Sequence, residues 1–231
     1  MLRTRDAAVL LDLGSGALGN LRLTIDYPRI DAVIVSHMHA DHFLDLIPLR
    51  YGLKYGPSVR GSRMALWLPP GGARMLRTLC AAFAPESPAD FLDEVFEVGE
   101  YDPAVPLDVN DLRLRFAKTR HYVDTYAMRA ERDNVSIVYS GDTAPCDEVV
   151  ELARSCTLFL CEATLGLGNE RGRRGHLSAE EAGQLAERAG VDQLVLTHYS
   201  TSYSPHALVR AAQGNFFGRV GIADDGDEHV I

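Results

Sequence analysis

The chain has 231 residues, of which 46% are hydrophobic and 24% charged, which is an ordinary composition for one globular domain. Asp and Glu outnumber Lys and Arg by 32 to 23, so the net charge is −9. A surface this acidic repels polyanions at long range, so a basic groove for DNA or tRNA would have to be local. No apolar run approaches the roughly 18 residues of a membrane span, and no CxxC pair occurs among the four cysteines. We therefore expect one cytoplasmic domain over residues 1–231, without membrane association.

The first half of the chain predicts buried strands followed by helices. An apolar strand ends at Asp12 in a glycine-rich turn, and a second one, entered from the turn at Pro28, delivers Ser36 and His37 to its carboxyl end. Apolar residues at helical spacing predict helices over residues 43–55, over residues 73–83 and within residues 85–97.

The second half is richer in strands. Alternation in "LRLRFAKT" (112–119) predicts a half-buried antiparallel strand, and "NVSIVYSGDT" predicts another that breaks at Gly141. Strands and helices then alternate, and one helix begins with a capping box of Ser178 and Glu181. The last segment, residues 218–231, predicts a final pair of strands. Two β-led halves with helices outside indicate an α/β fold, an αββα four-layer sandwich with two sheets face to face.

The stretch Ser36–His42, "SHMHADH", contains three of the eight histidines in the chain. Further polar residues follow later strand-like runs. The candidate ligands are His37, His39, Asp41, His42, His121, Asp142 and His198. Imidazole and carboxylate suit Zn²⁺, with Mn²⁺ or Fe as alternatives. A lone histidine after a strand is more often structural, but this whole pattern favours two divalent ions that share a bridging carboxylate.

"SHMHADH", His121, "SGDT" and "LTHYS" together resemble the metallo-β-lactamase superfamily, and the resemblance covers nearly the whole chain. It implies an αββα sandwich with a two-metal hydrolase site. Carried over by position, it implies one ion held by His37, His39 and His121, the other by Asp41, His42 and His198, and Asp142 as the bridge. Relatives in this family begin with a strand that precedes "AVLLDLGSG", so we expect the usual first N-terminal strand to be missing.

"FLCEATL", "GHLSAEEAG" and "LTHYSTSY" resemble the ribonuclease Z and cyclic-nucleotide phosphodiesterase branch. In that branch a glutamate and a histidine outside the metal shell form a pair beside the scissile phosphate, and Glu162 and His176 match them. The tRNA-processing members carry a long arm between the ligands that match His121 and Asp142. These two residues are only 21 positions apart here, which leaves no room for the arm.

The resemblance implies a phosphodiesterase that cleaves small phosphodiesters, such as cyclic nucleotides, through attack by a metal hydroxide. Asp41 would hydrogen-bond the hydroxide and accept its proton, and His176, oriented by Glu162, would stabilise or protonate the leaving group. Three arginines, Arg171, Arg173 and Arg174, either lie near the substrate phosphate or belong to a solvated loop. We expect a homodimer with a small-molecule phosphodiester substrate and no stable nucleic-acid complex.

Three alternatives stay open. The same metals could open a lactone, a β-lactam or another ester, although His176 has no obvious duty in lactone opening. A tRNA 3′-processing endonuclease is disfavoured by the missing arm and the acidic charge. A non-catalytic metal-binding or partner-binding relative is disfavoured by the complete set of ligands.

Overall fold

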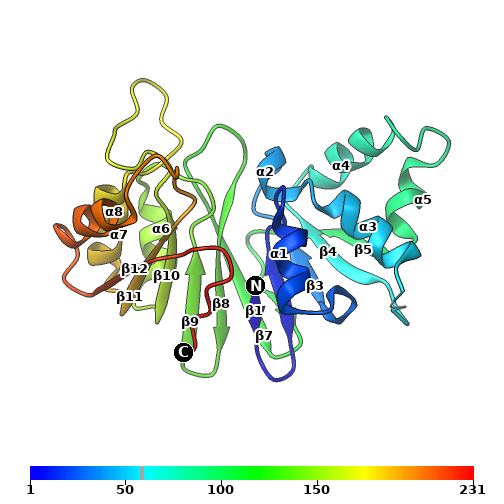
Figure 1. Ribbon diagram of the computed structural model, residues 1–231, viewed down its shortest axis with the longest axis horizontal. Coiled ribbons are helices and arrows are strands. Elements are labelled where there is room, and N and C mark those ends of the chain that lie inside the picture. The colour runs from blue at the N-terminus through cyan, green and yellow to red at the C-terminus, as the bar shows by residue number, and fades with distance from the viewer. Residues whose placement is uncertain (58–59) are drawn as a thin grey trace. The chain divides into compact units, whose positions relative to one another are not determined.

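Strands and helices alternate along most of the chain in the computed structural model, which describes residues 1–57 and 60–231. The chain divides into two compact units, Met1–Asp111 (unit 1) and Leu112–Ile231 (unit 2). In Figure 1 unit 1 runs from blue to blue-green and unit 2 from green to red. The predicted extent of a single hydrolase domain stays a prediction. None of the helices within the described residues is long and apolar enough to cross a membrane.

Unit 1 is built on a sheet that has five strands within the described residues, in the order β1-β2-β3-β4-β5. β1 is antiparallel to β2, and the other neighbours are parallel. Because parallel strands are covered on both faces, they read as continuous apolar runs, and every residue of β3 is fully buried. The strand bounds are β1 Leu2–Arg3, β2 Ala8–Leu11, β3 Ala32–Ile34, β4 Met64–Leu68 and β5 Phe96–Glu100.

The helices of unit 1 pack on a core centred on Val33, Leu46, Leu66 and Phe96. The helix predicted over residues 43–55 is confirmed as α3 (Leu46–Tyr55), but its predicted start is wrong, because a separate short helix, α2 (Ala40–Phe43), ends at residue 43. The Asp45 N–H donates to the carbonyl of Leu13 at 3.1 Å, outside the helical pattern, and this bond separates α2 from α3. The helix bounds are α1 Ala17–Thr24, α2 Ala40–Phe43, α3 Leu46–Tyr55, α4 Gly72–Cys80 and α5 Pro88–Asp93, with a 3₁₀ turn at Tyr27–Arg29.

The second sheet has seven strands within the described residues, in the order β12-β11-β10-β9-β8-β7-β6. β7, β8 and β9 pair antiparallel, whereas β9 to β12 are parallel neighbours. The predicted alternation of β7 is confirmed, since Leu114 is buried and Arg113 and Arg115 are exposed. The bounds are β6 Leu107–Val109, β7 Leu112–Lys118, β8 Tyr126–Arg132, β9 Val135–Tyr139, β10 Leu158–Glu162, β11 Gln193–Thr197 and β12 Arg219–Ile222.

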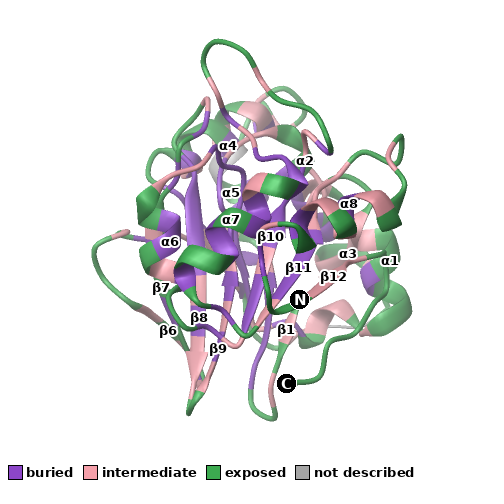
Figure 2. Cartoon of the chain, turned by 90° about the vertical axis from the view of Figure 1, so that its left-hand side faces the viewer, coloured by how far each residue is buried: buried purple, intermediate pink, exposed green. Residues whose placement is uncertain are grey.

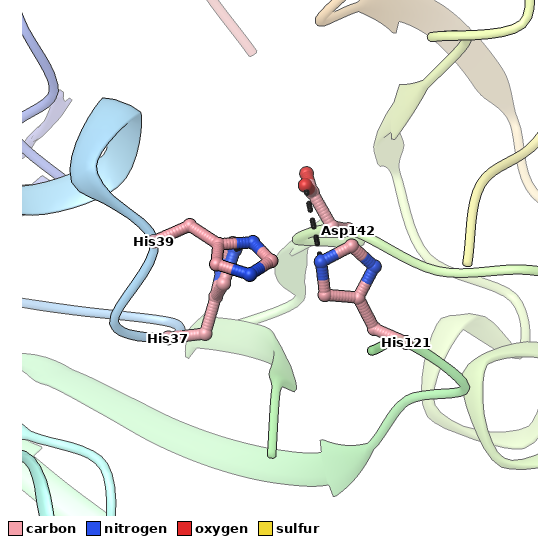
Figure 3. Close-up of side chains that lie close together, drawn as sticks. All are labelled: His37, His39, His121 and Asp142. Atoms are coloured by element: carbon pink, nitrogen blue, oxygen red, sulfur yellow. Dashed lines mark hydrogen bonds and ion pairs between the residues drawn. The ribbon is translucent and has the colours of Figure 1, made fainter. Parts of the chain in front are cut away.

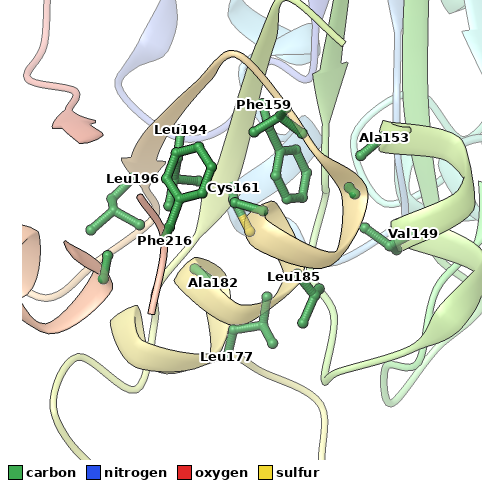
Figure 4. Close-up of a cluster of buried hydrophobic side chains, with 14 of the residues drawn as sticks. Val149, Ala153, Phe159, Cys161, Leu177, Ala182, Leu185, Leu194, Leu196 and Phe216 are labelled. Carbon is green, nitrogen blue, oxygen red and sulfur yellow. The ribbon is translucent and has the colours of Figure 1, made fainter. Parts of the chain in front are cut away.

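Three helices cover the core of unit 2: α6 Asp147–Ala153, α7 Ala179–Ala189 and α8 Pro205–Gln213. Figure 4 shows Phe159 and Cys161 of β10 packed among side chains of α6, α7 and β11. In Figure 2 β10 and β11 are buried, whereas α7 carries an exposed stripe. The predicted capping box is confirmed, because Ser178 accepts from the Glu181 N–H and Glu181 from the Ser178 N–H. Gly183 lets α7 approach α8, since a Cβ there would lie 2.4 Å from the carbonyl oxygen of Ala212.

The predicted final pair of strands is wrong. Only β12 forms, and residues 223–231, all of which are described, contain no strand. The apolar alternation stops after Ile222, where a cluster of acidic residues begins. Asp224 and Asp227 close a turn by two hydrogen bonds, Asp227 N–H to the carbonyl of Asp224 and Asp224 N–H to the carboxylate of Asp227. The turn uses the backbone groups that a second strand would need.

Candidate metal centre

Each predicted metal ligand lies at or shortly after the end of a strand. The histidine-rich stretch follows β3, while His121, Asp142 and His198 follow β7, β9 and β11. Because β9, β10 and β11 are parallel neighbours, their carboxyl ends meet at one edge of the sheet, where α/β proteins usually place their ligands. Register alone therefore brings Asp142, Glu162 and His198 to one edge of unit 2.

Unit 1 contributes what we call the unit 1 cluster, which consists of His37, His39, Asp41 and His42. Nε2 of His37 lies 3.1 Å from Nδ1 of His39, and Figure 3 shows the two rings turned toward one another. The rings of His37 and His42 are 4.0 Å apart between centroids, and Nε2 of His42 is 3.7 Å from the carboxylate of Asp41. Nitrogen atoms that face each other at this distance suit a shared cation.

Asp12 orients this cluster, a role that the sequence interpretation missed. Its carboxylate accepts hydrogen bonds from the Ser36 N–H at 2.6 Å, from the Ser36 hydroxyl at 2.8 Å and from Nδ1 of His42 at 2.7 Å. Asp12 has φ 61°, a left-handed conformation that aspartate tolerates better than most residues. The signal was available, because an acidic residue ends β2, the parallel neighbour of the strand before His37.

Gly14 is required in the glycine-rich turn that follows β2. A Cβ at Gly14 would lie 1.6 Å from the carbonyl oxygen of Asp41, so no other residue allows this approach. The Leu13 N–H also donates to the carbonyl of His42 at 2.8 Å. The glycine-rich turn after β2 thus fixes the backbone of the ligand run.

Unit 2 contributes the unit 2 cluster, which consists of His121, Asp142, His176 and His198. The Asp142 side chain is 3% exposed, and its two oxygens face different partners. Oδ2 lies 3.7 Å from Nε2 of His121 (dashed in Figure 3), and Oδ1 lies 3.7 Å from Nδ1 of His198. Potential ligand atoms of Asp142, His176 and His198 lie within 4.8 Å of one another. The two carboxylate oxygens of Asp142 thus lie near two different histidines.

Two candidate ligands of unit 2, His121 and His198, are held by uncharged groups. Nδ1 of His121 donates to the carbonyl of Gly175 at 2.8 Å, so this nitrogen carries the proton and Nε2 faces Asp142. Nδ1 of His198 lies 2.8 Å from the hydroxyl of Thr164. Such outer partners fix the tautomer and the ring orientation of metal-binding histidines. Neither Thr164 nor the Gly175 carbonyl was predicted, because such groups leave no pattern in a sequence.

Glu162 and His176 are in direct contact, with Nδ1 of His176 3.0 Å from Oε1 of Glu162. Glu162 is fully buried and also accepts from the backbone N–H groups of Thr143, Thr164 and Leu177 at 2.7 to 3.2 Å. Burial lowers the pKa of His176, but the hydrogen bond to Glu162 and the negative charges around it outweigh burial and raise the pKa above 6.5. His176 is thus equipped to hold a proton, and its catalytic role stays a prediction.

The three arginines of the loop before His176 differ in their contacts. The guanidinium of Arg174 forms two hydrogen bonds to Glu181, at 2.8 and 2.7 Å, so its positive charge is already paired with a carboxylate. Arg173 donates to the carbonyl of Tyr122 at 2.9 Å and lies over its ring. Arg171 is exposed. Arg174 is therefore unsuited to binding a substrate phosphate.

The chemistry of the donor set fits divalent metal ions. Four candidate ligands, His37, His42, His121 and His198, each have Nδ1 hydrogen-bonded to an oxygen atom. Nε2 is then the nitrogen that can coordinate, as in many protein metal sites. Two carboxylates, Asp41 and Asp142, complete a set of nitrogen and oxygen donors that suits Zn²⁺, Mn²⁺ or Fe.

Comparison with known proteins decides the family. The profile of the β-lactamase superfamily domain matches residues 8–199. The chain belongs to the metallo-β-lactamase superfamily. This membership confirms the predicted family and its α/β sandwich fold, and it places the chain among the metallo-hydrolases, whose activity uses divalent metal ions.

Two relatives resemble the chain over nearly its whole length. An uncharacterised protein of Mycobacterium leprae is 33% identical over 233 residues, covering 100% of this chain and 81% of the relative. The probable metallo-hydrolase YhfI of Bacillus subtilis is 26% identical over 226 residues, 98% of this chain and 89% of the relative. The crystal structure of YhfI superposes with a TM-score of 0.86, covering 97% of this chain and 88% of that chain.

A third relative is a ribonuclease Z. The protein of that name from Mycobacterium bovis is 28% identical over 249 residues, which cover 97% of this chain and 88% of the relative. The predicted likeness to ribonuclease Z proteins is therefore confirmed.

Proposed function

We propose that the chain is a dinuclear metal-dependent phosphodiesterase that cleaves small phosphodiesters, with cyclic nucleotides as the leading candidates. One divalent ion would bind His37, His39 and His121, and the other Asp41, His42 and His198, with Asp142 as the bridging ligand. Zn²⁺ is the expected metal. The two oxygens of Asp142, each directed at a different histidine of unit 2, support the bridging role.

The observation that carries the choice of substrate is the contact between Glu162 and His176 beside Asp142. An alkoxide is a poor leaving group, and a positioned acid accelerates its departure. His176 has its Nδ1 on Glu162 at 3.0 Å and a raised pKa, so it can present a proton at Nε2. Its Nδ1 is 3.9 Å from the carboxylate of Asp142, so the imidazole ring lies beside the proposed bridging ligand.

The remaining residues have simple duties. When bound, the two ions would supply a nucleophile at neutral pH and stabilise charge on the phosphate oxygens. The Asp41 side chain is 64% exposed and lies beside His42, so it can accept the proton that the nucleophile releases. Glu162 keeps His176 in one orientation and compensates its positive charge.

Processing of tRNA is not part of the proposal, although one relative is a ribonuclease Z. The 21 positions from His121 to Asp142 contain the β8 and β9 hairpin, which leaves no room for a substrate-binding arm. The net charge of −9 adds repulsion toward a polyanion. Efficient 3′-end cleavage of a precursor tRNA at nanomolar enzyme would overturn this exclusion.

A screen of the metal-loaded protein tests the substrate class. Cyclic nucleotides, bis-p-nitrophenyl phosphate, lactones and β-lactams would be compared at equal enzyme concentration. We expect the highest kcat/KM on a phosphodiester. A lactone or β-lactam turned over faster than every phosphodiester would contradict the proposal.

Replacing His176 separates acid catalysis from metal binding. His176→Ala should retain two metal ions per chain and lose about 10²–10⁴-fold in kcat on a cyclic nucleotide. The loss should be smaller on p-nitrophenyl esters, whose leaving group needs little protonation. His206→Ala, which changes an exposed histidine on α8, is the matched control and should keep full activity. Loss of metal by His176→Ala, or an unchanged kcat on the cyclic nucleotide, would refute the assigned role.

A further inference from the structure

Glu170 is the only acidic residue in the loop of residues 163–175, between β10 and α7, and its carboxylate faces inward along the loop. One oxygen accepts a hydrogen bond from the hydroxyl of Tyr122. The other accepts from two consecutive backbone N–H groups, Gly175 at 2.7 Å and His176 at 3.3 Å. Although the same loop carries three arginines, the Glu170 carboxylate binds uncharged groups of Tyr122, Gly175 and His176.

The Gly175 residue that Glu170 holds also holds a ligand. Its carbonyl accepts from Nδ1 of His121 at 2.8 Å, and its N–H donates to Glu170. The ring of Tyr122 lies against the same residue, since a Cβ on Gly175 would be 2.5 Å from that ring. Gly175 is buried, so its N–H would lose its partner if Glu170 were removed.

The ring of Tyr122 lies beside both His121 and His176. Tyr122 directly follows His121, and its ring centroid is 4.8 Å from that of His121 and 5.7 Å from that of His176. Arg173 donates to the Tyr122 carbonyl, so the loop contacts Tyr122 at its backbone, ring and hydroxyl.

We propose that Glu170, Tyr122 and Gly175 form a latch that holds His121 in its metal-binding tautomer and His176 in its working orientation. Glu170 is a positioning residue and touches neither substrate nor metal. The part that concerns His121 follows from the contacts alone, whereas the effect on turnover through His176 rests on the proposed phosphodiesterase function. Without Glu170 the backbone at Gly175 and His176 is free to rotate, and the Gly175 carbonyl moves away from Nδ1 of His121.

The latch can be tested on the metal-free protein by NMR of the imidazole nitrogens, without any assay of activity. In the wild type the Nδ1–H proton of His121 should be visible and slow to exchange with solvent. In Glu170→Ala and Glu170→Gln we expect this exchange to be faster, because the Gly175 carbonyl that accepts the proton is no longer held in place. Tyr122→Phe removes only the hydroxyl contact and should shift exchange in the same direction by less.

Glu151→Ala is the matched control, because it removes an exposed carboxylate of α6 that binds Arg154 and should leave His121 unchanged. Thermal unfolding checks that each variant is folded. An unchanged His121 proton in both folded Glu170 variants would overturn the latch. If Glu170→Ala fails to fold, Tyr122→Phe decides, and unaltered exchange there would overturn the latch too.

Kinetics give the second readout. With loaded enzyme, Glu170→Gln should lower kcat by about 10–100-fold while KM changes less than threefold, because the substituted residue does not touch the substrate. Glu170→Asp should recover part of kcat. A pure change in KM would contradict positioning. If the wild type hydrolysed no phosphodiester, the proposed function would be refuted. The NMR experiment would still test the latch, because it does not depend on activity.

Discussion

The two clusters of candidate ligands are built in different ways. The unit 1 cluster comes from one seven-residue stretch, and the carboxylate of Asp12 binds both His42 and Ser36, whose hydroxyl lies 3.0 Å from Nδ1 of His37. The unit 2 cluster gathers residues that are up to 77 positions apart, from His121 to His198. A separate group holds each of its histidines: the Gly175 carbonyl binds His121, the Thr164 hydroxyl binds His198 and the Glu162 carboxylate binds His176. A contiguous motif specifies its ligands locally, whereas a dispersed cluster needs strand register.

This difference predicts different sensitivity to substitution. A cluster oriented by one side chain should fail when that side chain changes. A cluster oriented by several independent groups should lose only part of its affinity with each change. The exception in unit 2 is Asp142, because its two oxygens face both His121 and His198.

Asp142→Ala should have the largest effect. If Asp142 bridges two ions, its loss should release both and lower kcat/KM by at least about 10³-fold, since metal ions supply several kcal/mol of charge stabilisation. Elemental analysis after gel filtration measures the loss. Retention of one full equivalent of metal would show that Asp142 serves one ion only.

Asp12→Asn and Thr164→Val compare the two clusters directly. Asparagine fits the left-handed backbone at position 12, but it is uncharged and has one acceptor oxygen, so it cannot replace both carboxylate oxygens that bind Ser36 and His42. Metal affinity should fall by about 10–100-fold for Asp12→Asn and by less than about tenfold for Thr164→Val. Competition with a chelator measures the metal dissociation constant of each variant.

Asp31→Asn is the control for the first variant. It changes a carboxylate that accepts from the Ala8 N–H at 2.8 Å, at the opposite end of the same strand pair. Equal losses for Asp12→Asn and Thr164→Val would remove the distinction between the clusters.

The sequence was most informative where an interaction is local. The capping box of Ser178 and Glu181 involves near neighbours only and could be predicted directly, and the run of candidate ligands from His37 to His42 is a short pattern that is visible in the sequence. Asp12 was visible as the end of a strand, but its role depends on the pairing of β2 with β3.

Where a backbone group or a competing contact decides, the sequence was insufficient. The Gly175 carbonyl could not be predicted to hold His121, because every residue has a carbonyl. The bond from Asp45 to Leu13 interrupts a helix whose apolar spacing looked continuous. The final strand pair was predicted from the apolar start of its segment, and the acidic turn from Asp224 to Asp227 stops it.

Glu162→Gln should produce the smallest effect, a shift in one pKa. Because Glu162 raises the pKa of His176, its neutral replacement should lower that pKa, and burial, which also lowers it, is then opposed by less negative charge. The fraction of protonated His176 at neutral pH should then fall. An NMR titration of the metal-free protein measures this change, and an equal or higher pKa in Glu162→Gln would contradict the pairing.

The central claim is that the two clusters together hold two ions. Elemental analysis of protein purified without chelator and saturated with Zn²⁺ tests it most directly. We expect a value that approaches two ions per chain for the wild type, because six candidate ligands and a bridging carboxylate exceed the needs of one tetrahedral ion. Saturation at one ion per chain would contradict the dinuclear account.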